Sequence, residues 1–377
     1  MNALLEVDNL VRHFVLRRSL LGQPRATVKA VDGVSFSVAA GETLALVGES
    51  GCGKSTVSRV VLRLIDPTAG TVRFEGRNVF AFDADELRAF RRKAQLVFQD
   101  PYGSLNPRML VGEILAEPVA LHTALSPARR TARVAELLDM VGLPSSAARR
   151  YPHEFSGGQR QRVAIARALA VEPKLVICDE PVSALDVSIR SQILNLLHDL
   201  QRRLGLAYIF ISHDLAVVKH IADRVAVMNL GRIVEIAPTD LLFSAPRHPY
   251  SHALLSAIPA PHPQARRDRI ILQGEMPSAL HPPSGCRFHT RCPHVVARCR
   301  DAVPALIDDS GHATACHRWA ELPAHKAPAV SAPTPALERL MAAFSRVRDV
   351  QPARGVDKVG PETGVPGAVQ HVARSTE

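Results

Sequence analysis

The stretch Gly48-Glu-Ser-Gly-Cys-Gly-Lys-Ser-Thr56 matches the pattern G-x-x-x-x-G-K-[ST]. A continuous apolar run, residues 43–47, precedes it, and residues 56–64 follow with apolar side chains at helical spacing. Between a strand and a helix, the glycines allow backbone N–H groups to turn toward phosphate oxygens, and the positive end of the helix adds to their attraction. The stretch therefore predicts a strand, a phosphate-binding loop and a helix.

Two side chains of this loop have expected roles. Lys54 supplies positive charge to the β- and γ-phosphates of a nucleotide, and the hydroxyl of Ser55 is a ligand for Mg²⁺. A glycine-rich turn that binds nothing is the alternative, but the flanking strand and helix argue against it. The residues expected to surround the phosphates are Gly48, Glu49, Ser50, Gly51, Cys52, Gly53, Lys54, Ser55 and Thr56.

A second apolar run, residues 175–178, leads directly into Asp179 and Glu180. Because parallel strands end at the same edge of a sheet, these two carboxylates are expected beside the phosphate-binding loop. Asp179 is suited to hold Mg²⁺, directly or through a water, and Glu180 to act as the general base on an attacking water. In isolation an apolar run followed by two acids is commonly structural, and its position in the next α/β block favours the catalytic interpretation.

Alternating strands and helices predict an α/β fold, a P-loop NTPase (RecA-like) core with a helical subdomain. We expect the ATPase domain at residues 1–240, with the helical subdomain at about 100–160 and a polar loop at 17–29. Proline and histidine then become frequent, which predicts a loop-rich, cysteine-containing extension over residues 241–320. Residues 321–377 lack clear periodicity and are expected to be mostly disordered.

The composition of the 377 residues excludes several classes of protein. There is no uncharged apolar run long enough to span a membrane, and the first residues lack the pattern of a signal peptide, so we expect a cytosolic protein. The net charge of +10 raises nucleic acid as a partner, but the aromatic content of 5% argues against a base-stacking surface. We expect no nucleic-acid partner.

Further motifs resemble one family of ATPases. Phe155-Ser-Gly-Gly-Gln159, followed by residues 160–167, resembles the signature motif of ABC-transporter ATPases, with Phe155 where leucine is usual. Gln99 resembles the glutamine of the family's Q-loop, residues 183–186 resemble the D-loop, and His213 resembles the switch histidine. All occur in the order of the family.

This resemblance implies ATP and Mg²⁺ as cofactors, with each ATP held between the P-loop of one ATPase subunit and the signature motif of another. The implied catalytic residues are Glu180, His213 and Gln99, and the implied Mg²⁺ ligands are Ser55, Gln99 and Asp179. The implied nucleotide contacts outside the P-loop are Phe14 (an A-loop aromatic that stacks on adenine), Gln99, Asp179, Ser156, Gly157, Gly158, Gln159 and Asp186.

Residues 98–107, 179–188, 247–255 and 285–293 resemble the dipeptide/oligopeptide importer ATPases, in particular the second of the two ATPase subunits in bacterial dipeptide permeases. That resemblance implies a heterodimer with a second homologous ABC ATPase, beneath two transmembrane permease subunits that an extracytoplasmic peptide-binding protein supplies. The chain would then be a peripheral subunit on the cytoplasmic face of the inner membrane. Two alternatives stay open: the same role with nickel or another small solute as cargo, and a soluble ABC ATPase acting on ribosomes or DNA.

Four of the six cysteines, Cys286, Cys292, Cys299 and Cys316, lie close together in the extension. Zinc sites usually contain C-x₂₋₄-C pairs, which are absent, and longer irregular gaps suit a [4Fe-4S] cluster better. The resemblance to peptide-importer ATPases also implies such a cluster. Zinc, with His289, His294, His312 or His317 as further ligands, and metal-free thiols are the alternatives. The expected role is structural, because the extension has little core of its own.

Overall fold

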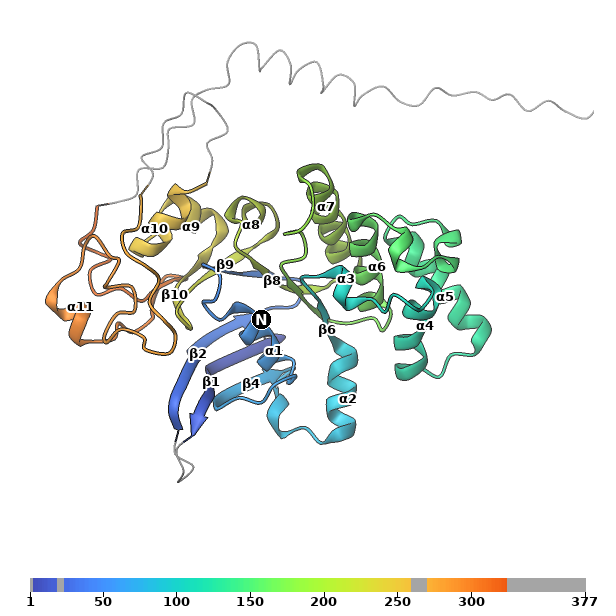
Figure 1. Cartoon of the computed structure of the whole chain (residues 1–377), viewed down its shortest axis with the longest axis horizontal. Coiled ribbons are helices and arrows are strands. Elements are labelled where there is room, and N and C mark those ends of the chain that lie inside the picture. The colour runs from blue at the N-terminus through green and yellow to red at the C-terminus, as the bar shows by residue number, and fades with distance from the viewer. Residues whose placement is uncertain (1–2, 19–23, 259–269, 324–377) are drawn as a thin grey trace, which may run out of the picture. The chain divides into compact units, whose positions relative to one another are not determined.

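The computed structural model describes residues 3–18, 24–258 and 270–323, and these contain two β-sheets (Figure 1). The smaller sheet is antiparallel, in the order β2 (Pro24–Val38), β1 (Leu5–Arg18), β4 (Ala69–Phe74) and β5 (Arg77–Asn78). The larger sheet has the order β11 (Ile307–Asp309), β12 (His312–Thr314), β10 (Arg232–Pro238), β9 (Arg224–Asn229), β3 (Thr43–Val47), β8 (Ala207–Ser212), β7 (Leu175–Asp179) and β6 (Ala94–Val97).

The centre of the larger sheet is parallel and completely covered. Every side chain of β3, β7 and β8 is buried, as expected for strands with helices on both faces. Strand β3 pairs with β8, β8 with β7, and β7 with β6, all in parallel. Their carboxyl ends therefore lie at one edge, which confirms the predicted α/β core.

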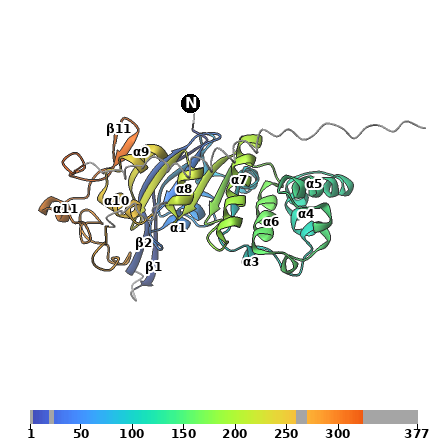
Figure 2. The same ribbon diagram turned by 90° about the horizontal axis from the view of Figure 1, so that it is seen from above.

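The helices follow the predicted alternation, and α4, α5 and α6 form the helical subdomain beyond β6 (Figure 2). Val134, Leu137 and Leu138, whose spacing places them on one face of a helix, are buried in α5. The helices are α1 (Lys54–Val61), α2 (Ala84–Lys93), α3 (Pro101–Ser104), α4 (Val111–His122), α5 (Pro127–Met140), α6 (Gly157–Leu169), α7 (Val187–Leu204), α8 (Leu215–Ile221), α9 (Thr239–Ser244), α10 (Pro249–Ser256) and α11 (Ala297–Asp301). Among the described residues, no helix is both long and apolar enough to cross a bilayer.

The prediction of a polar loop at residues 17–29 is wrong for most of these residues. Strand β1 continues to Arg18 and β2 begins at Pro24, so the two strands pair almost to their ends. Antiparallel pairing satisfies the backbone groups of a ribbon whatever the polarity of its side chains, and a polarity pattern therefore does not reveal it. The mostly disordered tail expected at residues 321–377 lies almost entirely outside the described residues.

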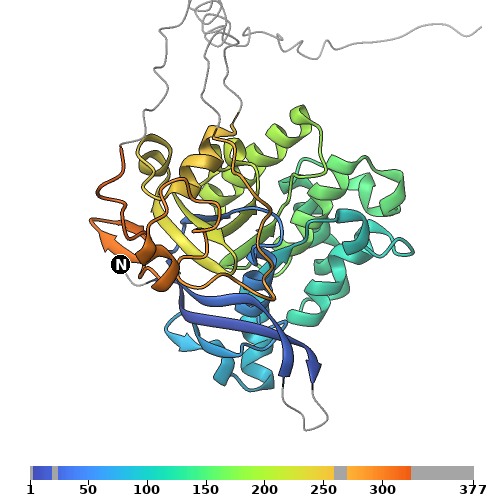
Figure 3. The same cartoon turned by 60° about the vertical axis from the view of Figure 1, so that its left-hand side comes forward.

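The extension is attached to the larger sheet by strand pairing, because β12 pairs with β10. Figure 3 shows the orange segments of the extension beside the yellow elements that precede them in the chain. At this junction the carboxylate of Glu235 in β10 is completely buried. It accepts hydrogen bonds from the backbone N–H groups of Arg247 and His248 at 2.7 and 3.0 Å, and lies 2.6 Å from Nε2 of His312. Burial alone would raise the pKa of Glu235, but these hydrogen bonds outweigh it and hold the pKa below its ordinary value.

We predict that Glu235→Gln lowers the free energy of unfolding by about 2–4 kcal/mol at pH 7, because it leaves the donors of this junction without their charged acceptor. A carboxylate with a lowered native pKa stabilises the fold above its unfolded pKa, and loses that effect as the pH falls through the native value. The difference between wild type and variant should therefore shrink below about pH 4. Urea unfolding across pH checks this, with the exposed Glu6→Gln as the control; a difference that does not change with pH would contradict it.

Candidate functional site

The loop between β3 and α1 is shaped by glycines that have no room for a side chain. Gly48 and Gly53 have φ angles of 153° and 110°. A Cβ on Gly48 would lie 2.2 Å from the carbonyl oxygen of Met228, and one on Gly53 would lie 2.1 Å from that of Ala30. Close backbone packing on both sides therefore fixes the path of the loop.

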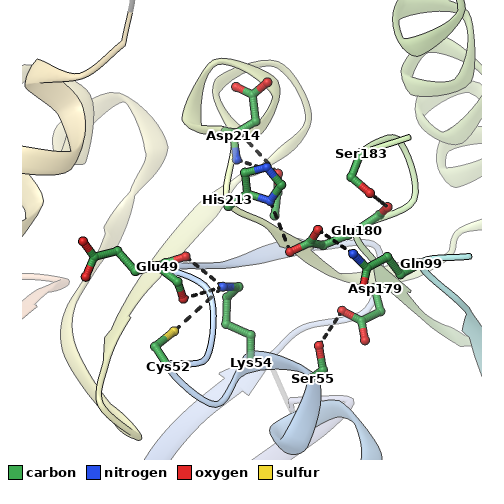
Figure 4. Close-up of polar contacts among 12 residues, drawn as sticks. Glu49, Cys52, Lys54, Ser55, Gln99, Asp179, Glu180, Ser183, His213 and Asp214 are labelled. Atoms are coloured by element: carbon green, nitrogen blue, oxygen red, sulfur yellow. Dashed lines mark hydrogen bonds and ion pairs between the residues drawn. The ribbon is translucent and has the colours of Figure 1, made fainter. Parts of the chain in front are cut away.

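The lysine of the loop is buried and faces inward (Figure 4). Nζ of Lys54 donates hydrogen bonds to the carbonyl oxygens of Gly48 at 2.7 Å and Glu49 at 3.0 Å. Helix α1 begins at Lys54 without a side-chain cap, so its first N–H groups are not occupied by a side chain. A buried ammonium beside uncapped N–H groups fits a phosphate group.

A hydroxyl of the phosphate-binding loop and a carboxylate at the end of β7 lie together. Oγ of Ser55 donates a hydrogen bond to Oδ1 of Asp179 at 3.0 Å. Burial raises the pKa of Asp179, and the charge of Glu180 adds to the effect, while the Ser55 hydroxyl opposes it. Oxygen ligands of this kind fit Mg²⁺, whose charge would favour the ionised carboxylate. Gln99, the third expected ligand, instead contacts Glu180.

Glu180 lies between two polar side chains from neighbouring strand ends (Figure 4). Nε2 of Gln99 donates to Oε2 at 3.1 Å, and Nδ1 of His213 lies 3.2 Å from Oε1. The backbone of Glu180 has a φ of 48°, which is unusual for a residue other than glycine. Its N–H donates to the carbonyl oxygen of Ile211 at 3.0 Å, and Ser183 donates to its carbonyl at 3.1 Å. The surrounding structure therefore holds this carboxylate in one orientation.

These groups face a cavity of about 420 Å³ above the loop. It is lined by Val28, Ala30, Ser50, Gly51, Gly53, Lys54, Ser55, Thr56, Gln99, Glu180, His213 and Ala279. Phe14 is not among the lining residues; it pairs across the ribbon with Val28, and the guanidinium of Arg12 lies 4.5 Å from the centre of its ring. Its expected contact with adenine stays a prediction.

The signature residues lie away from this cavity, at the start of α6. Ser156 caps the helix by accepting a hydrogen bond from the N–H of Gln159 at 3.3 Å, and the Gln159 side chain accepts one from the Ser156 N–H at 3.1 Å. Gly157 follows the cap, and a Cβ on Gly158 would lie 2.4 Å from a methyl carbon of Ile189 in α7. Asp186 precedes α7 without a side-chain cap bond. The chain therefore does not bring these predicted nucleotide contacts to its own P-loop.

The four cysteines of the extension lie around one cavity of about 20 Å³. Its lining includes Cys286, Cys292, Cys299, Cys316, His289, His294 and His317. Burial, with smaller contributions from the neighbouring thiols, raises the pKa of Cys286 to about 11. His312 lies elsewhere, because its Nε2 contacts Glu235. Within the described part of the chain, no three histidine, cysteine or acidic side chains are already arranged as a metal site.

Sequence reasoning missed three residues of the extension that reach the loop region. Tyr250 and Arg291 contact Glu49, and Ala279 lines the cavity. Tyr250 and Arg291 belong to the two segments singled out by resemblance, 247–255 and 285–293, but no local pattern indicated what they contact.

Two protein families match parts of the chain. Residues 31–183 match the family described as "ABC transporter", and residues 234–299 match "Oligopeptide/dipeptide transporter, C-terminal region".

Similar proteins cover most of the chain. The probable peptide ABC transporter ATP-binding protein y4tS of Sinorhizobium fredii is 55% identical over 84% of this chain and 90% of its own length. The di/tripeptide transport ATP-binding protein DppF of Pseudomonas aeruginosa is 50% identical, covering 84% and 98% respectively.

Similar solved structures cover the ATPase core. The dimeric ATP-binding cassette MJ0796 bound to ADP and Pi has a TM-score of 0.56 at 29% identity, over 62% of this chain and 98% of its own. The cbiO1 protein of Clostridium perfringens, part of the cbiONQ transporter, has a TM-score of 0.56 at 28% identity, over 64% and 91% respectively.

We predict that Gly53→Ala destabilises the fold by about 2–4 kcal/mol, because the added Cβ meets the backbone of Ala30 and the positive φ strains the alanine. Gly51→Ala is the matched variant in the same loop. Gly51 also has a positive φ, but nothing lies within 4 Å of its added Cβ, so about 1 kcal/mol is expected. Urea unfolding without nucleotide measures both; equal losses would contradict the close packing at Gly53.

Proposed function

The chain belongs to the ATP-binding proteins of peptide ABC transporters, and on this basis we propose that it hydrolyses ATP to power the uptake of dipeptides or oligopeptides across the cytoplasmic membrane. One observation carries the hydrolytic role: Glu180 lies between Gln99 and His213 at the edge of the cavity that contains Lys54. The relatives named for peptide transport support the cargo, and the alternatives of nickel, ribosomes or DNA gain no support from them.

The residues of the P-loop and those at the ends of β6, β7 and β8 have different roles in hydrolysis. Lys54 and the start of α1 bind the β- and γ-phosphates, and Ser55 and Asp179 hold Mg²⁺, which neutralises charge that develops on the phosphate oxygens. Glu180 accepts the proton of the attacking water. Gln99 and His213 keep its carboxylate oriented, so that little reorientation is needed in the transition state.

Membrane permease subunits are the partners that such an importer ATPase requires. A cavity of about 710 Å³ opens beside Gln99 and includes Phe98, Asp100, Ser104 and Arg167 in its lining. We assign the permease contact to this cavity and to the following segment, 101–107. Movement of Gln99 on nucleotide binding is then passed to the membrane subunits, while the chain itself stays peripheral on the cytoplasmic side.

A second homologous ATPase completes the nucleotide site in a heterodimer. The support is that Ser156, Gly157 and Gly158 of the signature motif do not line the cavity at the P-loop of the same chain. The signature motif is therefore available to ATP that the partner binds. Helix α6 presents its N-terminal end there, which favours an anion. Two permease subunits and an extracytoplasmic peptide-binding protein complete the proposed assembly.

We predict that Glu180→Gln retains ATP binding but hydrolyses ATP roughly 10²–10⁴ times more slowly, because the amide cannot accept the proton of the attacking water. With ATP, the variant should hold its heterodimer closed and co-purify from membranes with one other ATPase and two permeases. Phosphate release and mass spectrometry of the purified assembly measure this. The exposed Glu6→Gln is the control, and normal turnover in Glu180→Gln would exclude Glu180 as the base.

For the extension, we propose a [4Fe-4S] cluster held by Cys286, Cys292, Cys299 and Cys316. The support is the donor set: the four thiols line one cavity. Buried thiols of this kind ionise when a cation binds them. Zinc, with His289, His294 or His317 as additional ligands, is the alternative.

We predict that protein purified without oxygen is brown and contains about four iron atoms per chain. Cys292→Ser should lose most of the iron, whereas Cys178→Ala, which changes a buried cysteine of β7, should retain it. Metal analysis measures both. One zinc per chain, or no metal, would contradict the cluster.

A further inference from the structure

The extension reaches the phosphate-binding loop at Glu49, the first residue after Gly48. Its backbone N–H donates a hydrogen bond to the Tyr250 hydroxyl at 3.0 Å, and its carboxylate is bound by both terminal nitrogens of Arg291 at 2.7 and 2.9 Å. The carbonyl of the same residue accepts a hydrogen bond from Lys54. The backbone and side chain of Glu49 are therefore held from three directions.

The side chains of the extension that make these contacts are largely buried. The Arg291 side chain is only 9% exposed, and a two-point guanidinium–carboxylate pair fixes orientation as well as distance. Tyr250 is completely buried, and its ring lies against Phe288 with the ring centres 5.3 Å apart. The side chains of Arg291 and Tyr250 are therefore both held by packing, and neither contact is that of a mobile surface side chain.

A second set of hydrogen bonds links the extension to the phosphate-binding loop at Cys52. The N–H of Gly231, in the turn between β9 and β10, donates to the carbonyl oxygen of Cys52 at 2.8 Å. Arg287 donates to the carbonyl oxygen of Leu230 in that turn and pairs with Asp32 of β2. The extension therefore supports the loop directly at Glu49 and indirectly at Cys52.

We propose that Arg291 and Tyr250 are positioning residues for ATP hydrolysis, which act through Glu49 to hold the phosphate-binding loop in the shape that accepts the nucleotide. Backbone packing fixes the loop at Gly48 and Gly53, but nothing lies within 4 Å of a Cβ added to Gly51, between them. The geometry of the loop decides how well Lys54 and the N–H groups meet the phosphates. The proposal assigns a function to segments 247–255 and 285–293, which the catalytic residues leave unexplained. It rests on the proposed ATP site at the P-loop.

The test compares ATPase kinetics of the assembled transporter carrying Arg291→Ala or Arg298→Ala. Arg291 directly precedes Cys292, and Arg298 directly precedes Cys299, so the two are matched in position. Arg298 is exposed, and its side chain makes no hydrogen bond or ion pair with the described residues. We expect Arg291→Ala to lower kcat/KM for ATP roughly ten- to hundredfold, mainly through KM, and Arg298→Ala to leave it unchanged.

Three further variants separate positioning from folding. Arg291→Lys keeps the charge and should recover part of the loss, and Glu49→Gln should add little to Arg291→Ala, because both break the same contact. If Arg291→Ala does not fold, Tyr250→Phe keeps the ring packing, removes only the hydroxyl and should still raise KM. A folded Arg291→Ala with a KM within twofold of wild type, additive effects of the pair, or an unchanged KM in Tyr250→Phe would overturn the proposal.

Lys54→Ala distinguishes this proposal from the proposed ATP site itself. If Lys54→Ala leaves ATP binding unchanged, the P-loop site is wrong. If Lys54→Ala abolishes binding while Arg291→Ala and Tyr250→Phe retain the wild-type KM, the site stands and the positioning role is wrong.

Discussion

The parallel register of β3, β8, β7 and β6 is the constraint on which the site depends. Val47 pairs with Ser212, Asp179 with Ile211, and Val97 with Cys178. The residues that follow these pairs by one or two positions therefore lie at one edge of the sheet. In the sequence, more than 160 residues separate the first of them from the last. Backbone hydrogen bonds between buried strands thus set the distances among side chains that the reaction needs.

Local patterns were sufficient to predict this core. The buried strands contain uninterrupted apolar residues, and the chemistry-bearing residues follow them immediately, so polarity alone marks where each strand ends. The helix start at Ser156 also follows a local rule, because a serine followed three residues later by glutamine is typical of a capping box. Family resemblance added roles for Gln99 and His213 that their sequence surroundings did not indicate.

Other features depend on contacts that no local pattern reveals. The β1–β2 ribbon is polar on much of its surface, and its pairing comes from backbone groups. Tyr250 and Arg291 contact Glu49 from positions about 200 residues or more away in the sequence. Arg291 also directly precedes Cys292, and the cysteine suggests metal binding rather than an ion pair made by its neighbour. The burial of Glu235 is equally hidden, because its hydrogen-bond partners include Arg247 and His248, just before α10, and His312 of β12.

The separation between Glu49 and Arg291 has a consequence for biosynthesis. The two partners lie 242 residues apart, so the ribosome must add most of the protein after the loop before the ion pair can form. At ordinary rates of translation this interval is roughly 12–50 s. During that time the nascent ATPase core carries its loop glutamate without its guanidinium partner, and the loop gains this contact only after residue 291 has been added.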